Sequence, residues 1–243
     1  MLPICDESDI LLDCLFSVSG LRPDISDSSA EDDDLLIIDN GASSSIKKII
    51  YPFKRIVNAS NMFVNFAWNQ GLSYFFDNME YTHIVLMTQD VIMPSGWRDC
   101  VSDAFKKNFC NDVSDIFLFD VVDDRCEMMV ERGGKTRIEL RDNRQMPLIL
   151  LNRGCAQKVY PIPRAMRILF GSEYILTKLR LLDMKTWVYA DFCAYYSQDG
   201  VERHIESKFS VIANEDVVRW PFVMNDVLFD IDRLKYAGFK FCR

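Results

Sequence analysis

Three aspartates follow short apolar runs, and their chemistry depends on whether those runs are neighbouring strands. Asp6 follows "LPIC", Asp39 follows "LLII", and Asp90 comes soon after "IVLM". The carboxyl ends of parallel strands meet at one edge of a sheet, which is where open α/β sheets bind ligands. Carboxylates gathered there repel one another unless they face water or share a cation and hydrogen-bond donors. An alternative stays open, because aspartate is also common at strand ends as a turn former or helix cap.

The elements that position these acids can be predicted from hydrophobic periodicity. Strands are predicted at residues 2–5, 35–39, 55–57, 82–90, 114–124, 148–152 and 185–197. Amphipathic helices are predicted at residues 10–18, 61–79, 95–109 and 171–184. The order β-α-β-(β)-α-β-α-β favours an α/β fold with a largely parallel, doubly wound sheet. A loop is expected after Asp39, a turn after residue 152, and a short helix within residues 225–239.

Composition indicates one globular domain without general affinity for polyanions. The chain has 243 residues, of which 49% are hydrophobic and 12% aromatic, so it can bury a substantial core. Its net charge of −8 gives no attraction for nucleic acid or for an anionic membrane. A bound nucleotide would therefore need local help from a metal ion, backbone N–H groups or a few arginines.

Cysteine usage and the first residues bear on the compartment. The eight cysteines form no C-x-x-C pair and only two histidines are present, so a structural zinc site is not expected. The start "MLPICDESD" has no basic region, and the chain has no window of about 18 apolar residues. We therefore expect a cytoplasmic protein with reduced thiols, no signal peptide and no membrane span.

Four segments, taken in their order along the chain, carry a resemblance to a known family: "ICDESDILLDCLFSV", "LLIIDNGAS", "NASNMFVNFAWNQGL" and "HIVLMTQDVIMPSGW". Together they resemble motifs of the nucleotide-sugar-dependent glycosyltransferases of the GT-A fold. The resemblance is especially to the inverting family 2 group and its rhamnosyltransferase-like members, and it covers about the first 100 residues. It implies a Rossmann-like, mostly parallel central sheet flanked by helices, with a small acceptor-side extension.

The resemblance also implies a single GT-A-like catalytic domain over residues 1–243. Within it, residues 1–110 would form the nucleotide-sugar-binding half and residues 111–200 the acceptor-side half. Residues 201–243 would then be a C-terminal extension.

Residues of the donor site are implied by the same motifs. Asp39 would accept a hydrogen bond from an N–H group of the nucleotide base, and the backbone near Pro3 and Cys5 would line that base. Glu7 is expected to reach the base or the ribose. Asn69 matches an asparagine of the family's N-x-G element and would lie near the donor.

The metal site is implied by the segment Thr88-Gln89-Asp90, which stands at the family's D-x-D-type motif. Asp90 would bind Mn²⁺ or Mg²⁺, hard cations that take oxygen ligands and bridge a diphosphate. Gln89 would lie beside the nucleotide-sugar. The first acid is missing, as it is in relatives with N-x-D, so one carboxylate would hold the ion together with diphosphate oxygens and water. Trp68 also replaces an arginine often found before the asparagine motif.

An inverting transfer needs a carboxylate that removes the proton of the acceptor hydroxyl. Residues 161–191 resemble the family's acceptor-side block, in which Glu173 falls at the position of the base. The alternative is a capping role, with Ser172 as the N-cap and Glu173 favouring the first turn. Asp191 and Arg164 are further candidates for acceptor or phosphate contacts. The metal-ligating histidine of relatives is replaced, since Tyr195, Tyr196 and Ser197 occupy that region.

Two functions from different classes follow. The first is a metal-assisted inverting glycosyltransferase that moves a hexosyl or deoxyhexosyl group from a nucleotide-diphospho-sugar, of UDP or dTDP type, to a glycan or other hydroxyl acceptor. The second is a catalytically degenerate GT-A domain that binds a nucleotide or glycan without transfer, as the missing acid and histidine indicate. A nucleotidyltransferase is disfavoured, because no Gly-rich phosphate loop lies near residue 10.

Overall fold

The computed structural model describes residues 1–5, 10–19, 35–99, 116–122, 148–182, 184, 186–196 and 210–236, with backbone only for 116–122, 186–193 and 230–236. Its strands are β1 (Leu2–Ile4), β2 (Leu36–Asp39), β3 (Lys54–Val57), β4 (His83–Met87), β5 (Val91–Ile92), β6 (Ile116–Val122), β7 (Leu148–Asn152) and β8 (Thr186–Tyr196). Its helices are α1 (Leu11–Ser19), α2 (Ser44–Ile50), α3 (Val64–Asp77), α5 (Arg153–Val159), α6 (Gly171–Leu181) and α8 (Ser210–Tyr236).

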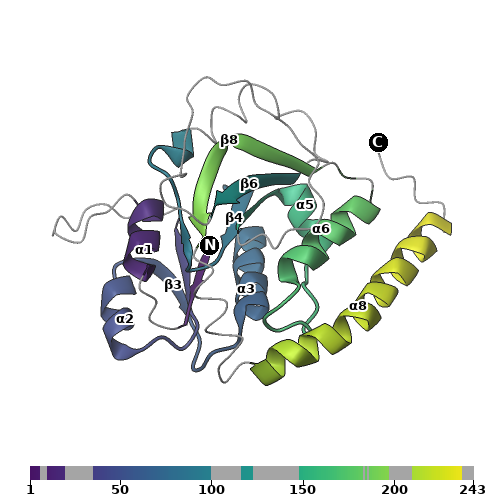
Figure 1. Cartoon of the computed structure of the whole chain (residues 1–243), viewed down its shortest axis with the longest axis horizontal. Helices are drawn as coiled ribbons and strands as arrows, with labels where there is room; N and C mark the ends of the chain where they lie inside the picture. The colour runs from purple at the N-terminus through teal and green to yellow at the C-terminus, as the bar shows by residue number, and fades with distance from the viewer. Residues whose placement is uncertain are drawn as a thin grey trace.

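Two sheets meet at the first residue. β1, β2 and β3 form a parallel sheet in that order, and β4, β7, β6, β8 and β5 form the second. The Met1 amine donates to the Val85 carbonyl oxygen (2.9 Å), and the Met87 N–H donates to the Met1 carbonyl oxygen (3.3 Å). These bonds place β1 beside β4, so the two sheets continue each other (Figure 1).

Strand direction separates the two sheets. The expected α/β fold is confirmed, and the first sheet is parallel throughout. The second sheet is mixed: β6 and β8 are parallel, whereas β7 runs antiparallel to both β4 and β6, and β5 runs antiparallel to β8. The largely parallel arrangement therefore holds for the N-terminal half, and β7 interrupts it because it inserts in the opposite sense between β4 and β6.

Alternation along the strands explains why helices cover both faces. In β2, Leu36 and Ile38 belong to one hydrophobic core, whereas Ile37 belongs to the other. β7 follows the same period of two, with Ile149 and Leu151 in the first core. Because successive side chains point to opposite faces, strands this apolar must be buried on both sides.

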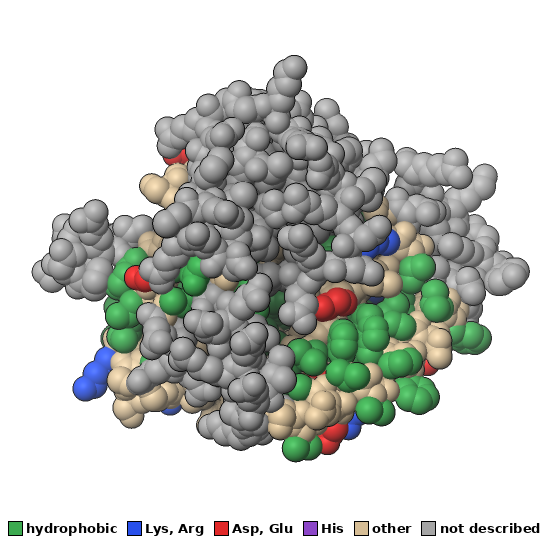
Figure 2. All heavy atoms as spheres, viewed as in Figure 1, with side chains coloured by type: hydrophobic (Ala, Val, Ile, Leu, Met, Phe, Trp, Pro, Cys, Tyr) green, Lys and Arg blue, Asp and Glu red, His purple; other side chains and the backbone are tan. Residues whose placement is uncertain are grey.

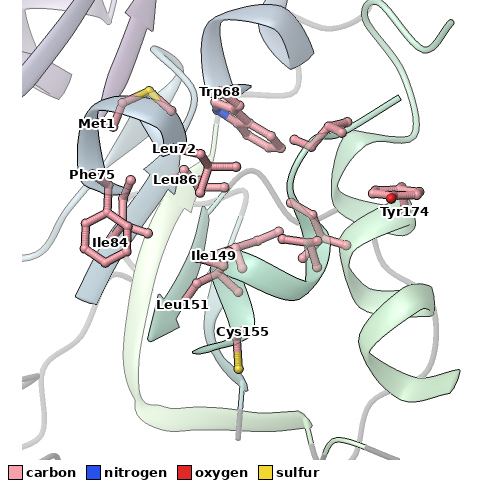
Figure 3. Packing of buried hydrophobic residues seen from close by; sticks show 14 of the residues in the cluster. Met1, Trp68, Leu72, Phe75, Ile84, Leu86, Ile149, Leu151, Cys155 and Tyr174 are labelled. Atoms are coloured by element: carbon pink, nitrogen blue, oxygen red, sulfur yellow. The ribbon is translucent and has the colours of Figure 1, made fainter. Parts of the chain in front are cut away.

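Each face has its own helices. α3, α5 and α6 pack on the face of Leu36 and Ile38, and Figure 3 shows Trp68, Leu72 and Phe75 of α3 converging with residues of β4 and β7 there. Residues of α1 and α2 form the opposite core. The buried residues of α1 are those whose helical spacing predicted them: Leu11, Cys14, Leu15 and Val18.

Two short helices replace segments predicted as a loop and a turn. The segment after Asp39 contains α2, whose N-cap Ser43 accepts a hydrogen bond from the Ile46 N–H (3.4 Å). The segment after β7 contains α5, whose N-cap Asn152 accepts from the Cys155 N–H (2.8 Å). Those expectations were wrong because each helix has only seven residues, too few for a clear apolar period, so the cap residue is the main local signal.

The C-terminal helix is longer than its sequence pattern predicted. α8 runs for 27 residues with Pro221 inside it, whereas only a short helix near its end was expected. Proline argues against a helix interior because it removes a backbone donor. Residues Val211, Val218, Phe222 and Phe229 are exposed on α8, and Figure 2 shows hydrophobic side chains gathered over this region. Among the described helices, none is long and apolar enough to cross a membrane.

Candidate active site

Asp39 is the last residue of β2, and one of its carboxylate oxygens has no hydrogen-bond partner in the described structure. The side chain is only 1% exposed, and its Oδ1 accepts a hydrogen bond from the Ala42 N–H (2.9 Å), which closes the turn after the strand. Its Oδ2 is buried and accepts no hydrogen bond from any residue that the structure describes. A buried acceptor without a donor is costly, so this atom is suited to the N–H of a ligand.

A network of side-chain amides holds the loop beside Asp39. Asn40 Oδ1 accepts from Asn58 Nδ2 (3.1 Å) and from the Met62 N–H (2.9 Å), and Asn40 Nδ2 donates to Asn61 Oδ1 (2.9 Å). Asn58 and Gln70 exchange two further bonds, of 2.8 and 2.9 Å, which connect the loop to α3. Because these amides satisfy each other, the edge around Asp39 is pre-organised.

Glycine at position 41 is required by the same loop. Gly41 has a φ of +85°, and a Cβ there would lie 2.8 Å from the Asn61 backbone nitrogen. The backbone of residues 60 and 61 therefore packs directly on the turn that follows Asp39, which only glycine permits.

Gln89 connects the ends of β1 and β4. Its Oε1 accepts a hydrogen bond from the Cys5 N–H (3.0 Å), and its side chain is buried. Both residues were predicted to contact the nucleotide-sugar, and the structure brings them together at the carboxyl ends of their strands. Pro3, the third predicted residue of this region, is buried in β1 opposite Ile38.

Asn69 has both ends of its side-chain amide bonded to the chain. Its Nδ2 donates to the Ile162 carbonyl oxygen and its Oδ1 accepts from the Ile162 N–H, each at 2.8 Å. This pair fixes the segment between α5 and α6 on α3. Trp68, in the position of the family's arginine, is a core residue whose indole N–H donates to the Met87 carbonyl oxygen (3.3 Å). Contact of Asn69 with a donor stays a prediction.

Tyr196, the last residue of β8, lies near both the predicted metal ligand Asp90 and the predicted general base Glu173. β5 pairs with β8 so that Val91, the residue after Asp90, lies opposite Tyr196. Burial raises the pKa of the Tyr196 phenol above its ordinary value, and the nearby carboxylates of Asp90 and Glu173 raise this pKa further. Asp90 and Glu173 are therefore both close enough to this phenol to affect its pKa, although they come from segments far apart in sequence.

Cys14 of α1 borders the same region. Its Sγ lies 4.0 Å from the Thr88 carbonyl oxygen, and its side chain is fully buried. Burial raises the pKa of this thiol above its ordinary value, and the Asp90 carboxylate raises it further. Cys14 is therefore a neutral packing residue rather than a nucleophile.

Glu173 lies in the first turn of α6, and the capping alternative predicted for this helix is only partly met. The N-cap is Phe170, in the left-handed conformation (φ 62°), and its side chain makes no capping bond. Ser172 is inside the helix, and its hydroxyl donates to Glu173 Oε2 (2.9 Å). Ser172 as N-cap was therefore wrong, because the N-cap is Phe170, two residues earlier.

The residues around Asp90 fit a cation held partly by its substrate. No group of three His, Cys, Asp or Glu side chains within the described ranges is arranged to hold a metal ion. Asp90 is half-buried, and the Thr88 hydroxyl is buried without a hydrogen-bond partner in the described structure. Mg²⁺ commonly uses one or two carboxylates and takes its other oxygens from phosphates and water. A single carboxylate beside an unsatisfied hydroxyl suits that mode better than a closed protein cage.

Three predicted residues are not part of this cluster as described. Glu7 lies outside the described residues, and for Asp191 only the backbone position within β8 is described. Arg164 is exposed in the segment between α5 and α6. A cavity of about 410 Å³ lies toward the starts of β1, β2 and β4, and none of the predicted site residues lines it.

Asp216 of α8 is a buried acid that no sequence pattern singles out. Its side chain is 0% exposed, and it accepts hydrogen bonds from the N–H groups of Arg167, Ile168 and Leu169, at 2.7–3.1 Å. A local signal was lacking, because the acid and its donors lie 47–49 residues apart.

Comparison with solved structures identifies the fold. One match is a crystal structure of GalNAc-T7 with UDP, GalNAc and Mn²⁺ (TM-score 0.52, 10% identity), which covers 81% of this chain. Two others are of S. aureus TarS and its fragment 1–349, both with a TM-score of 0.57, at 12% and 13% identity, over 85% and 88% of this chain. No protein-family model and no curated protein sequence matches the chain.

These matches show a GT-A-like glycosyltransferase fold, as the sequence motifs predicted. This chain spans 42% of the GalNAc-T7 chain, 39% of the TarS chain and 63% of the shorter TarS fragment. At such low identity the likeness defines the fold alone, and activity has to be argued from the site.

Proposed function

We propose that the chain is an inverting glycosyltransferase that moves a sugar from a nucleotide-diphospho-sugar to the hydroxyl of a glycan or another acceptor. This proposal is supported by the buried, unsatisfied Oδ2 of Asp39 at the end of β2 and by the nearness of Asp90 and Glu173 to Tyr196, within a GT-A-like fold. One acid follows a strand end, where donors bind in α/β sheets, and the other lies in the first turn of α6.

The nucleotide base would bind at Asp39. Its unsatisfied, buried Oδ2 would accept an N–H of the base, and the amide network around Asn40 would hold this acceptor in place. Uracil and thymine each present one such N–H, so UDP- and dTDP-sugars are the donors that we propose. The structure with UDP and GalNAc bound to a protein of the same fold makes UDP-GalNAc a suitable first probe.

Asp90 would hold Mn²⁺ or Mg²⁺ together with oxygens of the diphosphate. The bound cation would neutralise the negative charge that develops on the leaving nucleoside diphosphate. In a chain with a net charge of −8, that charge has little general compensation. Asp90 itself would orient the diphosphate end of the donor toward Glu173.

Glu173 would be the general base. Its carboxylate would take the proton of the acceptor hydroxyl while that oxygen bonds to the anomeric carbon and the bond to the diphosphate breaks. The Ser172 hydroxyl, which donates to Glu173 Oε2, would fix the orientation of the carboxylate and leave Oε1 for the proton. The transferred group is proposed to be a hexosyl or deoxyhexosyl unit.

Donor hydrolysis and binding test this proposal together. A thermal-shift screen of nucleoside diphosphates, with and without Mn²⁺, should show stabilisation by at least one nucleotide, because a ligand of the native state raises its stability. Turnover of the matching nucleotide-sugar should be lost in Asp90→Ala and in Glu173→Ala, with folding retained by circular dichroism. Asp77→Ala, an exposed acid at the end of α3, is the matched control. Full activity in both variants would contradict the mechanism.

A second function is favoured by one observation. The described residues contain no three-membered metal-ligating group, and Thr88 stands in place of the first acid. A GT-A-like domain that binds a nucleotide or glycan without transfer would show this pattern. Calorimetric nucleotide binding without turnover, over a panel of donors with Mn²⁺, would select this function over the first.

A further inference from the structure

The segment that leads into α6 is held from two sides by side chains of other helices. On one side Asp216 of α8 accepts three consecutive N–H groups, from Arg167, Ile168 and Leu169. On the other side Asn65 of α3 donates from Nδ2 to the carbonyl oxygens of Met166 (3.2 Å) and Leu169 (3.0 Å). Both N–H and carbonyl groups of this segment are therefore bonded to side chains of other helices, which restrains the backbone before α6.

A buried carboxylate needs such donors. Removing a charge from water costs several kcal/mol unless hydrogen bonds or an opposite charge compensate for it. The three N–H groups supply that compensation, and the Arg167–Glu215 ion pair (3.0 Å) lies at the surface, where an ion pair contributes little. The interaction between Asp216 and the segment is therefore reciprocal: each satisfies the other.

The next residue is held by the same helix. Phe170 has a φ of 62°, a conformation that costs energy for a residue with a side chain, and it is the N-cap of α6. Its ring stacks on Trp220 of α8, with ring centroids 4.9 Å apart and planes 15° apart. Trp220 follows Asp216 by one helical turn, so both face the start of α6.

The opposite side leaves no room for adjustment. A Cβ at Gly171, the first residue of α6, would collide with the side-chain amide of Asn65. If the start of the helix moved toward α3, it would clash with Asn65. If it moved away from α8, it would lose the contacts with Asp216 and Trp220. Glu173 follows three residues after Phe170, and the direction of its carboxylate depends on where the helix begins.

We infer that Asp216, acting through residues 167–170, is a positioning residue for Glu173, and that α8 is part of the catalytic apparatus rather than an appendage. The inference rests on the proposed role of Glu173 as the general base. It predicts that loosening Asp216 lowers the rate of the chemical step and leaves donor binding unchanged, because the side-chain hydrogen bonds of Asp39 and Asn40 in the described structure do not involve α8.

Hydrogen–deuterium exchange of the full chain tests the positioning without any substrate. Asp216→Asn keeps the size of the side chain and removes the charge and one acceptor. The amides of residues 167–175 should then exchange on the order of tenfold faster or more, because a buried N–H loses its partner. Asp226→Asn, an exposed acid on the same helix, should leave exchange unchanged. Unchanged exchange in Asp216→Asn would overturn the inference.

Donor hydrolysis then tests the effect on catalysis. With UDP-GalNAc and Mn²⁺ as the probe, kcat of Asp216→Asn should fall about tenfold or more while KM for the donor stays within about twofold. Trp220→Phe, which reduces the ring that stacks on Phe170 and keeps an aromatic side chain against the core, should show the same split if Asp216→Asn does not fold. Faster exchange with unchanged kcat would overturn the catalytic part of the inference. A wild-type chain without turnover would contradict the proposed function with this donor, whereas the exchange result would still decide the positioning.

Discussion

The two ends of the candidate site are built differently. The donor end, at Asp39, is supported by residues 40–62 and by Gln70, so most of its contacts come from the strand and loop that immediately follow. The catalytic end, at Glu173, depends on Asn65 of α3 and Asp216 of α8, which lie far from α6 in sequence. The contacts of the donor end therefore come from the first sheet, its loop and α3, whereas the catalytic end requires both α3 and α8, two helices distant from α6 in sequence, to be in place.

The largest expected effect of breaking this arrangement is at Asn65. Asn65→Ala removes both amide hydrogen bonds to the segment before α6 and leaves a small cavity. We expect the free energy of unfolding to fall by about 2 kcal/mol. Urea denaturation followed by circular dichroism measures this change. Ser73→Ala, on the same helix, should change it by less than about 0.5 kcal/mol.

Because the two ends rely on different residues, Asn65→Ala should leave nucleotide binding at the donor end unchanged. Nucleotide affinity of folded Asn65→Ala, measured by calorimetry, should equal that of the wild type, because the amide network around Asn40 does not include Asn65. A parallel loss of nucleotide affinity would mean that the two ends form one cooperative unit, and the proposed difference between them would be wrong.

A smaller effect is expected at Asp39. Asp39→Asn retains an oxygen for the Ala42 N–H but replaces the unsatisfied Oδ2 with a donor. Nucleotide binding should weaken by about tenfold, which corresponds to about 1.4 kcal/mol, because hydrogen bonds to charged groups contribute about 1.5–3 kcal/mol. Calorimetric Kd values for UDP measure it, with Asp77→Asn as the control. Equal Kd values for Asp39→Asn and the wild type would exclude Asp39 as the hydrogen-bond acceptor for the nucleotide base.

The smallest effect, and one of opposite sign, is expected at Thr88. Its hydroxyl is buried without a partner in the described structure, so Thr88→Val exchanges an unsatisfied polar atom for a methyl group of similar size. The free energy of unfolding should rise by roughly 0.5–1 kcal/mol. Stability is measured in urea, and Mn²⁺-dependent nucleotide binding is measured alongside. If the variant loses that binding, the Thr88 hydroxyl takes part in the cation site. Asp90 and the diphosphate oxygens would then not be enough to hold the cation.

Several elements could be predicted because their signal is local. Spacing identified the buried side of α1, and apolar runs identified β2, β4 and β7. The direction of β7 could not be predicted, because strand direction depends on pairing between segments far apart in the chain. α8 was largely missed, since Pro221 argues locally against the helix that the surrounding contacts of Asp216 and Trp220 stabilise.

The sequence by itself determined which acids stand at strand ends. Asp39 and Asp90 follow apolar runs, and the period of two in those runs depends only on neighbouring residues. Only the tertiary structure decided what surrounds the predicted site residues: Oδ2 of Asp39 has no partner in the described chain, Asn69 binds Ile162, and Glu173 and Asp90 both lie near Tyr196. The physical reason is that the hydrogen bonds and burial behind these outcomes join residues separated by many tens of positions, and no local pattern specifies such partners.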